Sequence, residues 1–275
     1  MIDKNSILSE QDIQFVADLA IRAGKLAVEM RDTVDVKHKT GPNDLVTCAD
    51  IALSKLILQE LSLRFPDDQI ISEEEPPGKA TANGRTWLVD PIDGTDNYVR
   101  NDSQYAVMIG LLLNGNAEFG CVYCPPLDYC YYGGNQFGVY KIEGLQAPRL
   151  VRHSFPANMA PPVRLMMGWR DRKKNPWIKD LPDINWLESG SIGVKVAKVL
   201  NDEADVFVHL SGKLKLWDTA GPVAIALGAG LEVGTMKDDE LSFPLPEIAH
   251  GTVVIIGRPG SLAWTRKTLV APVEH

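Results

Sequence analysis

The sequence has none of the features that mark a membrane protein, a disulfide-stabilised protein or a nucleic-acid-binding protein. No apolar run approaches the length of a membrane span, and residues 1–5 lack the apolar segment of a signal peptide. The four cysteines are unevenly spaced in a chain of 275 residues, which is typical of reduced thiols rather than of a disulfide framework. No basic patch accompanies the formal net charge of −8, so a nucleic-acid polymer is not an expected partner. We expect a cytoplasmic protein without membrane contact.

The cysteines also give little support to a zinc or redox site. Cys121 and Cys124 form a CxxC pair, but Glu118–Cys124 has the pattern of a strand, in which residues three apart face opposite sides. The sequence has no second cysteine pair and no histidine at metal-binding spacing. We therefore interpret both cysteines as packing residues.

The composition is that of an enzyme-sized globular protein. Hydrophobic residues make up 45% of the chain and charged residues 23%, and the length permits one large domain or two closely associated ones. Because the net charge is negative, an anionic small substrate would need a local cation in order to bind.

Hydrophobic periodicity divides the chain into two halves. Helical spacing covers residues 11–31 and 51–65, and strand-like runs between residues 105 and 142 are separated by Gly and Asn, as in an antiparallel meander. Residues 143–162 hold four prolines and little periodicity, so we place a boundary there, between residues 1–145 and residues 146–275. In the second half strands alternate with helices, which favours an α/β layer. The elements predicted there are strands at 163–168, 204–210 and 252–256, and helices at 193–201, 218–228 and from 261.

The stretch Trp87–Asn97, WLVDPIDGTDN, is where functional residues are most concentrated. Three apolar residues lead into Asp90, as in a buried strand that reaches its carboxyl end, and Gly94 permits a sharp turn there. Asp90, Asp93 and Asp96 lie in or beside that turn. Carboxylates this close repel one another unless a cation or shared protons compensate. The turn therefore predicts a site for a hard metal ion.

Magnesium would suit such a site, because it prefers oxygen ligands and needs only a few carboxylates. Two magnesium ions can polarise a phosphate and lower the pKa of an attacking water. Suitable oxygens come from two adjacent loops: Glu73, Asp90, Asp93 and the backbone carbonyl of Ile92. Glu73 belongs to a run of three glutamates after a predicted strand at 69–72, for which a solvated loop and a functional role both remain open. The amides of Gly94 and Thr95, if they open a helical turn, could bind phosphate oxygens.

The spacing of the aspartates separates two phosphatase chemistries. In the DxDxT signature of haloacid-dehalogenase-type phosphatases, the first Asp is a nucleophile and the second, two residues later, is an acid. Here the spacing is D-x-x-D, and the residue two positions after Asp90 is Ile92. The spacing therefore argues against an aspartyl-phosphate mechanism.

The same stretch resembles the DPIDGTxN signature of the inositol monophosphatase superfamily. DLVTCAD at 44–50 and ISEEE at 71–75 resemble two further family elements, in the family's order. SGSIGVKVAKVL at 189–200 and LWDTAGPVAIALGAGLEV at 216–233 resemble its two C-terminal blocks. An ordered set of this kind is much more specific than one DxxDGT. The resemblance implies an α/β (α+β) fold, a layered αβαβα sandwich with an antiparallel N-terminal sheet and a mixed C-terminal sheet.

The resemblance also implies a magnesium-dependent, lithium-sensitive enzyme with two or three ions. The implied metal ligands are Glu73, Asp90, the Ile92 carbonyl, Asp93 and Asp218. Thr95, paired with Asp50 or Glu73, would orient and help to deprotonate the attacking water. Glu74 would lie near the ligands or near a weaker third ion, and Lys39 lies in a loop, 37–43, that closes over the metals in the family. Taken alone, Asp218 would be an ordinary N-cap at the start of a predicted helix.

The substrate is less well defined by the resemblance. The resemblance implies that the substrate contacts Gly190, Ser191 and Ser211. At position 211, however, inositol monophosphatases carry Glu rather than Ser, and that Glu contacts inositol hydroxyls. SEEEPPG and KLKLWDTAGP look more like bisphosphate nucleotidases. Those enzymes need cations for a second phosphate, and Lys213, Lys215 and Arg170 are candidates, with solvent-facing turn residues as the alternative for both lysines. DGTDNYV, in contrast, has the Asn-aromatic pair of the inositol phosphatases.

We therefore rank three hypotheses. The first is a 3′(2′),5′-bisphosphate nucleotidase that converts 3′-phosphoadenosine 5′-phosphate to AMP. The second is an inositol-1-monophosphatase or a broad sugar phosphatase that includes fructose 1,6-bisphosphate among its substrates. The third is a metal- or phosphate-binding protein without turnover, which would be expected to have lost a ligand, whereas none is missing here. In the first two cases the partner is a small phosphorylated substrate, and a homodimer is possible.

Overall fold

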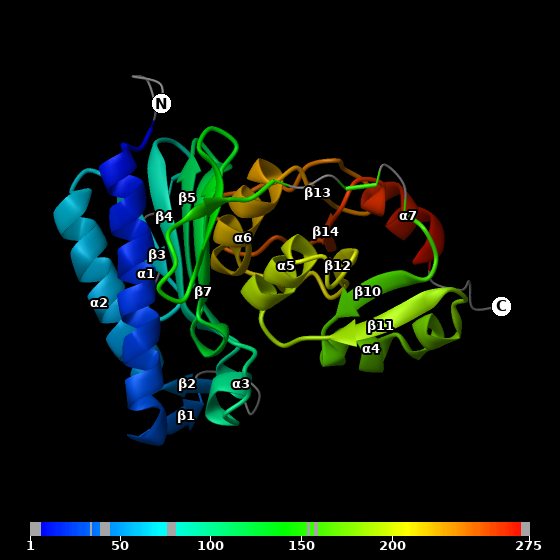
Figure 1. Cartoon of the computed structure of the whole chain (residues 1–275), viewed down its shortest axis with the longest axis horizontal. Coiled ribbons are helices and arrows are strands. Elements are labelled where there is room, and N and C mark those ends of the chain that lie inside the picture. The colour runs from blue at the N-terminus through cyan, green and yellow to red at the C-terminus, as the bar shows by residue number, and fades with distance from the viewer. Residues whose placement is uncertain are drawn as a thin grey trace.

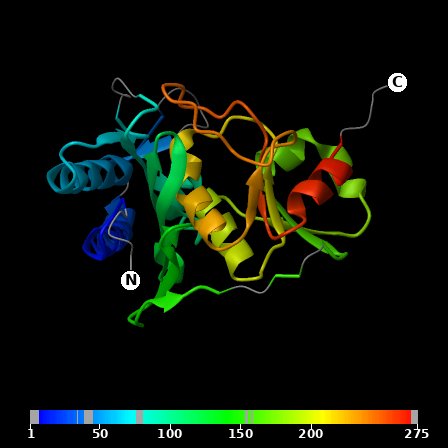
Figure 2. The ribbon, with the colours of Figure 1, turned by 90° about the horizontal axis from the view of Figure 1, so that it is seen from above.

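The computed structural model describes residues 7–33, 35–38, 45–75, 81–152, 155–156 and 159–270, without the side chains of residues 33, 38 and 45. Helices and strands stack in five layers, helix, sheet, helix, sheet, helix, as Figures 1 and 2 show from two directions. The predicted αβαβα sandwich is confirmed. In the part of the chain that is described, no helix has both the length and the apolar character to cross a membrane.

The first sheet has seven strands in the order β3-β4-β5-β6-β7-β8-β9. Their bounds are β3 (Gln69–Ser72), β4 (Arg85–Asp93), β5 (Ala106–Leu113), β6 (Asn116–Cys124), β7 (Tyr129–Gly134), β8 (Gly138–Glu143) and β9 (Arg149–Leu150). All neighbours from β4 to β9 pair antiparallel, as the meander predicted. The predicted antiparallel sheet is confirmed with one exception at its edge, where β3 pairs parallel with β4.

Helices α1 (Glu10–Met30) and α2 (Cys48–Arg64) cover the outer face of this sheet (Figures 1 and 2). Each begins with a reciprocal capping box, in which Ser9 pairs with Asp12 and Thr47 pairs with Asp50. Their buried residues form one hydrophobic core with the outward-facing side chains of the sheet, including Trp87. The structure therefore starts α2 three residues earlier than the periodicity predicted, at the residue that follows its cap.

The second sheet is mixed, as predicted. Its order is β11-β10-β12-β14-β13, with β10 parallel to β11 and β12 and with β14 antiparallel to β12 and β13. The strands are β10 (Val163–Met167), β11 (Ile184–Glu188), β12 (Val206–His209), β13 (Glu232–Gly234) and β14 (Val254–Gly257). Helix α7 (Ser261–Thr268) packs on its outer face through a separate hydrophobic core. A short helix, α4 (Trp169–Lys174), follows β10.

Helices α5 (Ile192–Leu200) and α6 (Leu216–Gly228) form the middle layer, between the two sheets (Figure 2). Helix α6 lies directly on β5 and β6, because glycines face it there. A Cβ on Gly120 would lie 2.1 Å from the oxygen of Gly221, and one on Gly110 would lie 2.4 Å from the nitrogen of Gly221. This close contact brings the start of α6 beside the carboxyl end of β4.

The sequence missed the shortest elements. These are β1 (Val36–His38), β2 (Leu45–Thr47), α3 (Thr95–Val99), α4, β9, β11 and β13. Cys121 belongs to the core under α1 and Cys124 to the core around α5 and α6, so the two do face opposite sides of β6. The boundary at residues 145/146 stays a prediction; β9, just beyond it, pairs with β8 in the first sheet.

Candidate functional site

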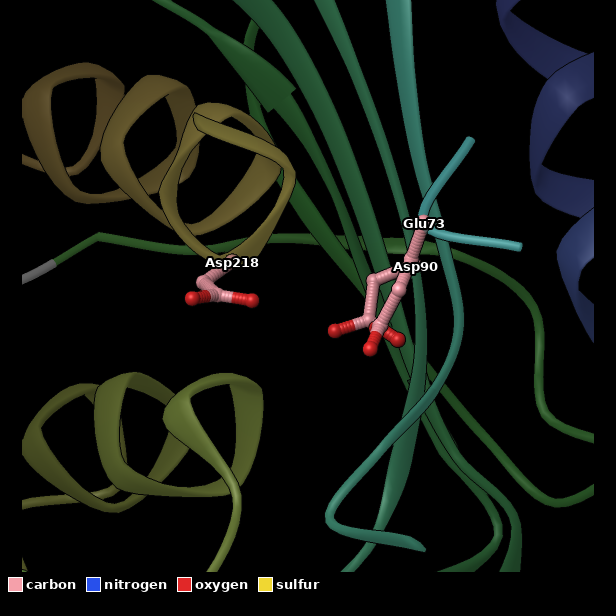
Figure 3. A group of neighbouring side chains, drawn as sticks. All are labelled: Glu73, Asp90 and Asp218. Atoms are coloured by element: carbon pink, nitrogen blue, oxygen red, sulfur yellow. The ribbon is translucent and has the colours of Figure 1, made fainter. Parts of the chain in front are cut away.

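Three carboxylates from separate elements converge at the carboxyl end of β4. Glu73 follows β3 and is held there by a hydrogen bond from its backbone nitrogen to the Val89 oxygen, 3.0 Å away. Asp90 lies in β4, and Asp218 lies in the first turn of α6. One oxygen of each side chain lies within 4.8 Å of those of the other two. Figure 3 shows Asp218 facing Glu73 and Asp90 across a narrow gap, an arrangement that could hold a metal ion.

A β-bulge turns Asp93 toward the same side of the sheet as Asp90. Residues three apart in a regular strand face opposite sides. Here the register shifts between the two aspartates, so that Asp90 lies opposite Met108 and Asp93 lies opposite Ala106. Met108 and Ala106 both belong to the core around α5 and α6. Both aspartates therefore face the middle layer of the sandwich.

The start of α5 holds Asp93. Its Oδ2 atom accepts a hydrogen bond from the Ser191 hydroxyl and another, of 2.8 Å, from the Gly193 backbone nitrogen. Ser191 is also the N-cap of α5, since its oxygen accepts from the Val194 nitrogen at 3.1 Å. Burial raises the pKa of Asp93, whereas the hydrogen bonds from Ser191, Gly193 and the Ile192 backbone lower it. The start of α5 thus fixes the orientation of the Asp93 carboxylate.

Gly94 and Thr95 open a helical turn, which is the condition under which their amides could bind phosphate oxygens. Gly94 has φ 95°, in the left-handed region, and is the N-cap of α3. The Thr95 hydroxyl lies 3.1 Å from Asp50 Oδ1 and 3.1 Å from the Ile92 carbonyl oxygen. Asp50 Oδ2 is already bound by the Thr47 nitrogen at 2.8 Å and the Thr47 hydroxyl at 2.6 Å. The cap of α2 therefore fixes Asp50 beside Thr95. The resemblance implied Asp50 or Glu73 as the partner of Thr95, and the contact observed is the one with Asp50.

The carboxylates of the site repel one another strongly. Burial raises the pKa of Asp90 well above its usual value, and the charges of Glu73, Asp93 and Asp218 raise it further. The pKa of Asp218 is also raised well above its usual value, mainly by burial and next by the charge of Glu73. Asp90 Oδ1 is buried and has no hydrogen-bond partner among the described residues. A divalent cation would satisfy this oxygen and offset the repulsion, so the donor set fits a hard metal ion.

Asp218 combines this position with a structural role. Helix α6 begins at Leu216, two residues before the predicted start, and Lys215 rather than Asp218 is its N-cap. Asp218 Oδ2 accepts a 2.7 Å hydrogen bond from the Lys215 nitrogen and so closes the first turn. Asp218 is therefore not the N-cap that the sequence taken alone predicted, although its side chain does stabilise the start of the helix.

The other predicted site residues come from the turn before α5 and from the segment before α6. The Gly190 nitrogen donates to Gln104 Oε1 at 2.8 Å, and the glycine lies so close to Asn97 that a Cβ would be 2.1 Å from its Oδ1 atom. Lys213 is exposed and Lys215 is partly exposed, both just before α6. The residues of the 37–43 loop that follow His38, including Lys39, lie outside the described part of the chain.

Arg170 and Asp96 form an exposed ion pair of 3.2 Å between α4 and α3. Asp96 is one of the three carboxylates of the central turn, and the sequence left it without a partner. The pair connects an element of the first half of the chain to one of the second half, next to Thr95. An exposed pair contributes little to stability, on the order of 0–1 kcal/mol.

A polar cluster that the sequence did not predict lies beside Ser211. His209 Nδ1 is 3.3 Å from Asp171 Oδ2, and His209 Nε2 is 2.7 Å from the Ser211 hydroxyl. Asp171 is buried and also accepts a 3.0 Å hydrogen bond from the Leu210 nitrogen. Lys195, buried in α5, is close enough to influence the charge state of His209. The signal available in the sequence was a pair of lysines on an otherwise apolar helix and a histidine at the end of an apolar strand.

The family model of the inositol monophosphatases matches residues 9–268. The chain belongs to the inositol monophosphatase family. A 3′(2′),5′-bisphosphate nucleotidase CysQ from Salmonella typhimurium is 29% identical over 84% of this chain and 93% of the relative. Inositol monophosphatase 1 from Rattus norvegicus is 27% identical, over 80% of this chain and 82% of the relative.

Solved structures of the family have the same fold. An IMPase from Thermotoga maritima has a TM-score of 0.77 with 25% identity, and the match covers 94% of this chain and 96% of that one. CysQ from Bacteroides thetaiotaomicron has a TM-score of 0.72 with 21% identity, over 92% and 99% of the two chains. The protein is therefore an enzyme, a phosphatase that hydrolyses phosphoric monoesters of small molecules, and its family depends on metal ions. The hypothesis of a protein without turnover is not retained.

Proposed function

We propose that this phosphatase uses magnesium-activated water and that its substrate is 3′-phosphoadenosine 5′-phosphate, which it converts to AMP. The observation that supports the metal site most directly is the convergence of Glu73, Asp90 and Asp218 within 4.8 Å, around a buried oxygen of Asp90 that has no partner among the described residues. Asp93 and the Ile92 carbonyl would complete the ligand set. Two or three magnesium ions would be held there.

Bound magnesium would polarise the phosphate and lower the pKa of the attacking water. Asp50 and Thr95 would position that water. When the Thr95 hydroxyl donates to Asp50 Oδ1, its lone pairs are available to accept a hydrogen bond from the water. Burial raises the pKa of Asp50, against the hydrogen bonds from Thr47, so Asp50 is a better proton acceptor than an exposed carboxylate. The amides of Gly94 and Thr95, where α3 begins, would bind the phosphate oxygens.

The choice of a bisphosphate rests on the sequence around Ser211 and on the similarity to CysQ proteins. Ser211 stands where a hydroxyl-binding glutamate would be expected in an inositol monophosphatase, and it contacts His209 instead. Lys213 and Lys215 precede α6, the helix that carries Asp218, so a second phosphate bound by them would lie near the metal site. Arg170 is the third candidate, although it already pairs with Asp96.

An inositol-1-monophosphatase, or a broad sugar phosphatase that also accepts fructose 1,6-bisphosphate, is the second candidate. It is favoured by the Asn97–Tyr98 pair at the start of α3 and by the similarity to inositol monophosphatase 1. A homodimer and a cytoplasmic location stay predictions.

A side-by-side assay of the three substrates with magnesium tests the proposal. We expect the highest kcat/KM for phosphoadenosine phosphate, and loss of all activity in excess chelator and in Asp93→Asn, with the fold retained. A higher kcat/KM for inositol 1-phosphate or fructose 1,6-bisphosphate would reverse the ranking. Full activity in excess chelator would reject the metal mechanism.

Alanine variants of the three cations test the second phosphate. Lys213→Ala, Lys215→Ala or Arg170→Ala should reduce kcat/KM for the bisphosphate by about tenfold or more, because a charged hydrogen bond contributes roughly 1.5–3 kcal/mol. The same variants should leave adenosine 3′-monophosphate unaffected. Lys179→Ala, at an exposed lysine in the turn after α4, is the matched control. Equal loss on both substrates would remove the argument for a second phosphate site.

A further inference from the structure

Lys195 is a buried ammonium group beside the carboxylate cluster. Its residue is 2% exposed, in the middle layer of the sandwich, and its Nζ atom lies 5.0 Å from the centre of the Phe207 ring. Burial lowers the pKa of Lys195 to about 8, against the charges of Asp93, Asp171 and Asp218, which raise it. The protonated form therefore still predominates at neutral pH. A charge buried at this depth costs stability unless its surroundings compensate, and these three carboxylates do so.

Among the described residues, the ammonium group donates a hydrogen bond to the turn that precedes α5. Lys195 Nζ donates to the Gly190 carbonyl oxygen at 2.9 Å. The same turn supplies the two donors that bind Asp93 Oδ2, the Ser191 hydroxyl and the Gly193 nitrogen. On its other side the turn is held against Asn97, with no room for a Cβ on Gly190. A continuous set of contacts thus runs from Lys195 through the turn to Asp93.

We propose that Lys195 is a positioning residue for the metal site, which fixes the turn at 190–193 so that Asp93 presents its carboxylate to the metal. The proposal rests on the proposed function, in which Asp93 is a ligand. Asp93 is held at Oδ2 by donors that belong to this turn, so any displacement of the turn would rotate or release the carboxylate. Partners of this kind orient the ligands of metal sites in general, and their loss typically weakens metal binding about 10–100-fold.

Two effects of removing Lys195 have opposite signs, and this makes the proposal testable. A neutral residue at position 195 would no longer repel a divalent cation, which by itself would tighten metal binding. Release of the turn would loosen Asp93 and weaken metal binding. The proposal requires that the second effect is the larger one.

The experiment is a titration of metal-free protein with Mn²⁺, which also takes carboxylate oxygens, followed by calorimetry or by the loss of its free EPR signal. Lys195→Met should bind Mn²⁺ at least about tenfold more weakly than the wild type. Lys198→Met is the control, because it removes the same charge from the same helix at a partly exposed position. Equal or tighter binding by Lys195→Met would overturn the proposal.

A second variant tests whether the effect travels through the turn. Ser191→Ala removes one donor to Asp93, so the double variant Lys195→Met/Ser191→Ala should bind Mn²⁺ about as weakly as the weaker single variant. Full additivity of the two losses would contradict the proposal. If Lys195→Met does not give the circular dichroism spectrum of a folded protein, Lys195→Ala, which also removes the hydrogen-bond donor, takes its place. A wild type that binds no Mn²⁺ would reject the metal site itself, and with it both proposals, whereas unchanged binding in the variants would reject only this one.

Discussion

Single residues at this site are placed where they destabilise the metal-free protein. Asp90 is 2% exposed, and like charges surround it. Its pKa is raised in the folded protein, so the folded state binds a proton more tightly than the unfolded chain does. Its stabilising contribution is therefore present below the unfolded pKa near 3.8 and is lost as the pH rises through the higher folded value. At neutral pH this raised pKa therefore opposes folding unless a cation is bound.

The variant Asp90→Asn should therefore be more stable than the metal-free wild type at neutral pH, although it should be inactive. For a chain of this size each kcal/mol of repulsion removed raises Tm by roughly 2–4 °C. The difference should shrink toward pH 4, where the wild-type carboxyl is protonated as well. Thermal unfolding in chelator measures this, with Asp67→Asn, at an exposed aspartate, as the control. A lower Tm for Asp90→Asn at neutral pH would contradict the interpretation.

His209 controls how the Ser211 hydroxyl is oriented. Burial lowers the pKa of His209, and so does Lys195, against the charge of Asp171. At neutral pH the ring is therefore neutral; with its proton on Nδ1 toward Asp171, its Nε2 atom accepts from Ser211. When the pH falls through the lowered pKa, the ring becomes charged and Nε2 becomes a donor, which reverses the hydrogen bond.

If Ser211 contacts substrate, as the family resemblance implies, KM should rise at acid pH by a factor of roughly 2–12, the equivalent of one hydrogen bond of about 0.5–1.5 kcal/mol. The pH profile of KM checks this. In Ser211→Ala that rise should be absent, because no hydroxyl is left to reorient. A rise of the same size in both proteins would assign the pH dependence to other groups.

At the scale of elements, the approach of α6 to the first sheet determines where Asp218 lies. Gly110 and Gly120 have no side chains where α6 crosses their strands, and Gly221 has none on the facing side of the helix, so the two backbones can approach closely. Glycines within strands mark close approach of another backbone, and here that backbone carries a carboxylate of the site. The short cap of α6, from Lys215 to Asp218, then directs this carboxylate toward β4.

We expect Gly120→Ala to displace α6, because the added Cβ would lie 2.1 Å from the Gly221 oxygen. Overpacking of this kind typically costs about 1–3 kcal/mol of folding free energy. Since Asp218 moves with the helix, affinity for Mn²⁺ should fall as well. Denaturant unfolding and metal titration measure the two effects, with Glu118→Ala on the same strand as the control. Unchanged metal affinity in Gly120→Ala would show that the contact does not position the site.

At the scale of the whole molecule, the site joins the first sheet to the helices of the middle layer. Glu73 and Asp90 come from the first sheet, Asp218 from α6 and the donors to Asp93 from the start of α5. A bound ion would therefore connect segments more than 100 residues apart in the sequence, as Asp90 and Asp218 are. Such an ion binds the folded state in preference to the unfolded chain, which lacks the preformed site.

Magnesium should therefore stabilise the protein as a whole. At a free concentration 100-fold above Kd the gain in unfolding free energy is about 2.7 kcal/mol. We expect a concentration-dependent rise of Tm with Mg²⁺ that chelator reverses and that Asp218→Asn reduces. A Tm that is independent of magnesium in the wild type would be evidence against a metal site shared between the first sheet and α6.

The sequence by itself determined the features that depend on local spacing. The capping boxes, the helical periodicity of α1 and α2 and the alternation of elements in the second half all follow from residues a few positions apart. The D-x-x-D spacing and the order of the motifs likewise indicated the family and its chemistry. These signals are local because capping bonds and side-chain periods are set within one or two turns.

Only the tertiary structure decided which of these residues meet. Short strands such as β11 and β13 exist through pairing with distant strands, and their own sequences carry little signal. The Arg170–Asp96 pair, the cluster around His209 and the contact of Lys195 with the turn before α5 all depend on how the layers pack. The bulge in β4 and the glycine contact under α6 then bring the carboxylates together, because backbone approach, rather than spacing along the chain, sets the distance between them.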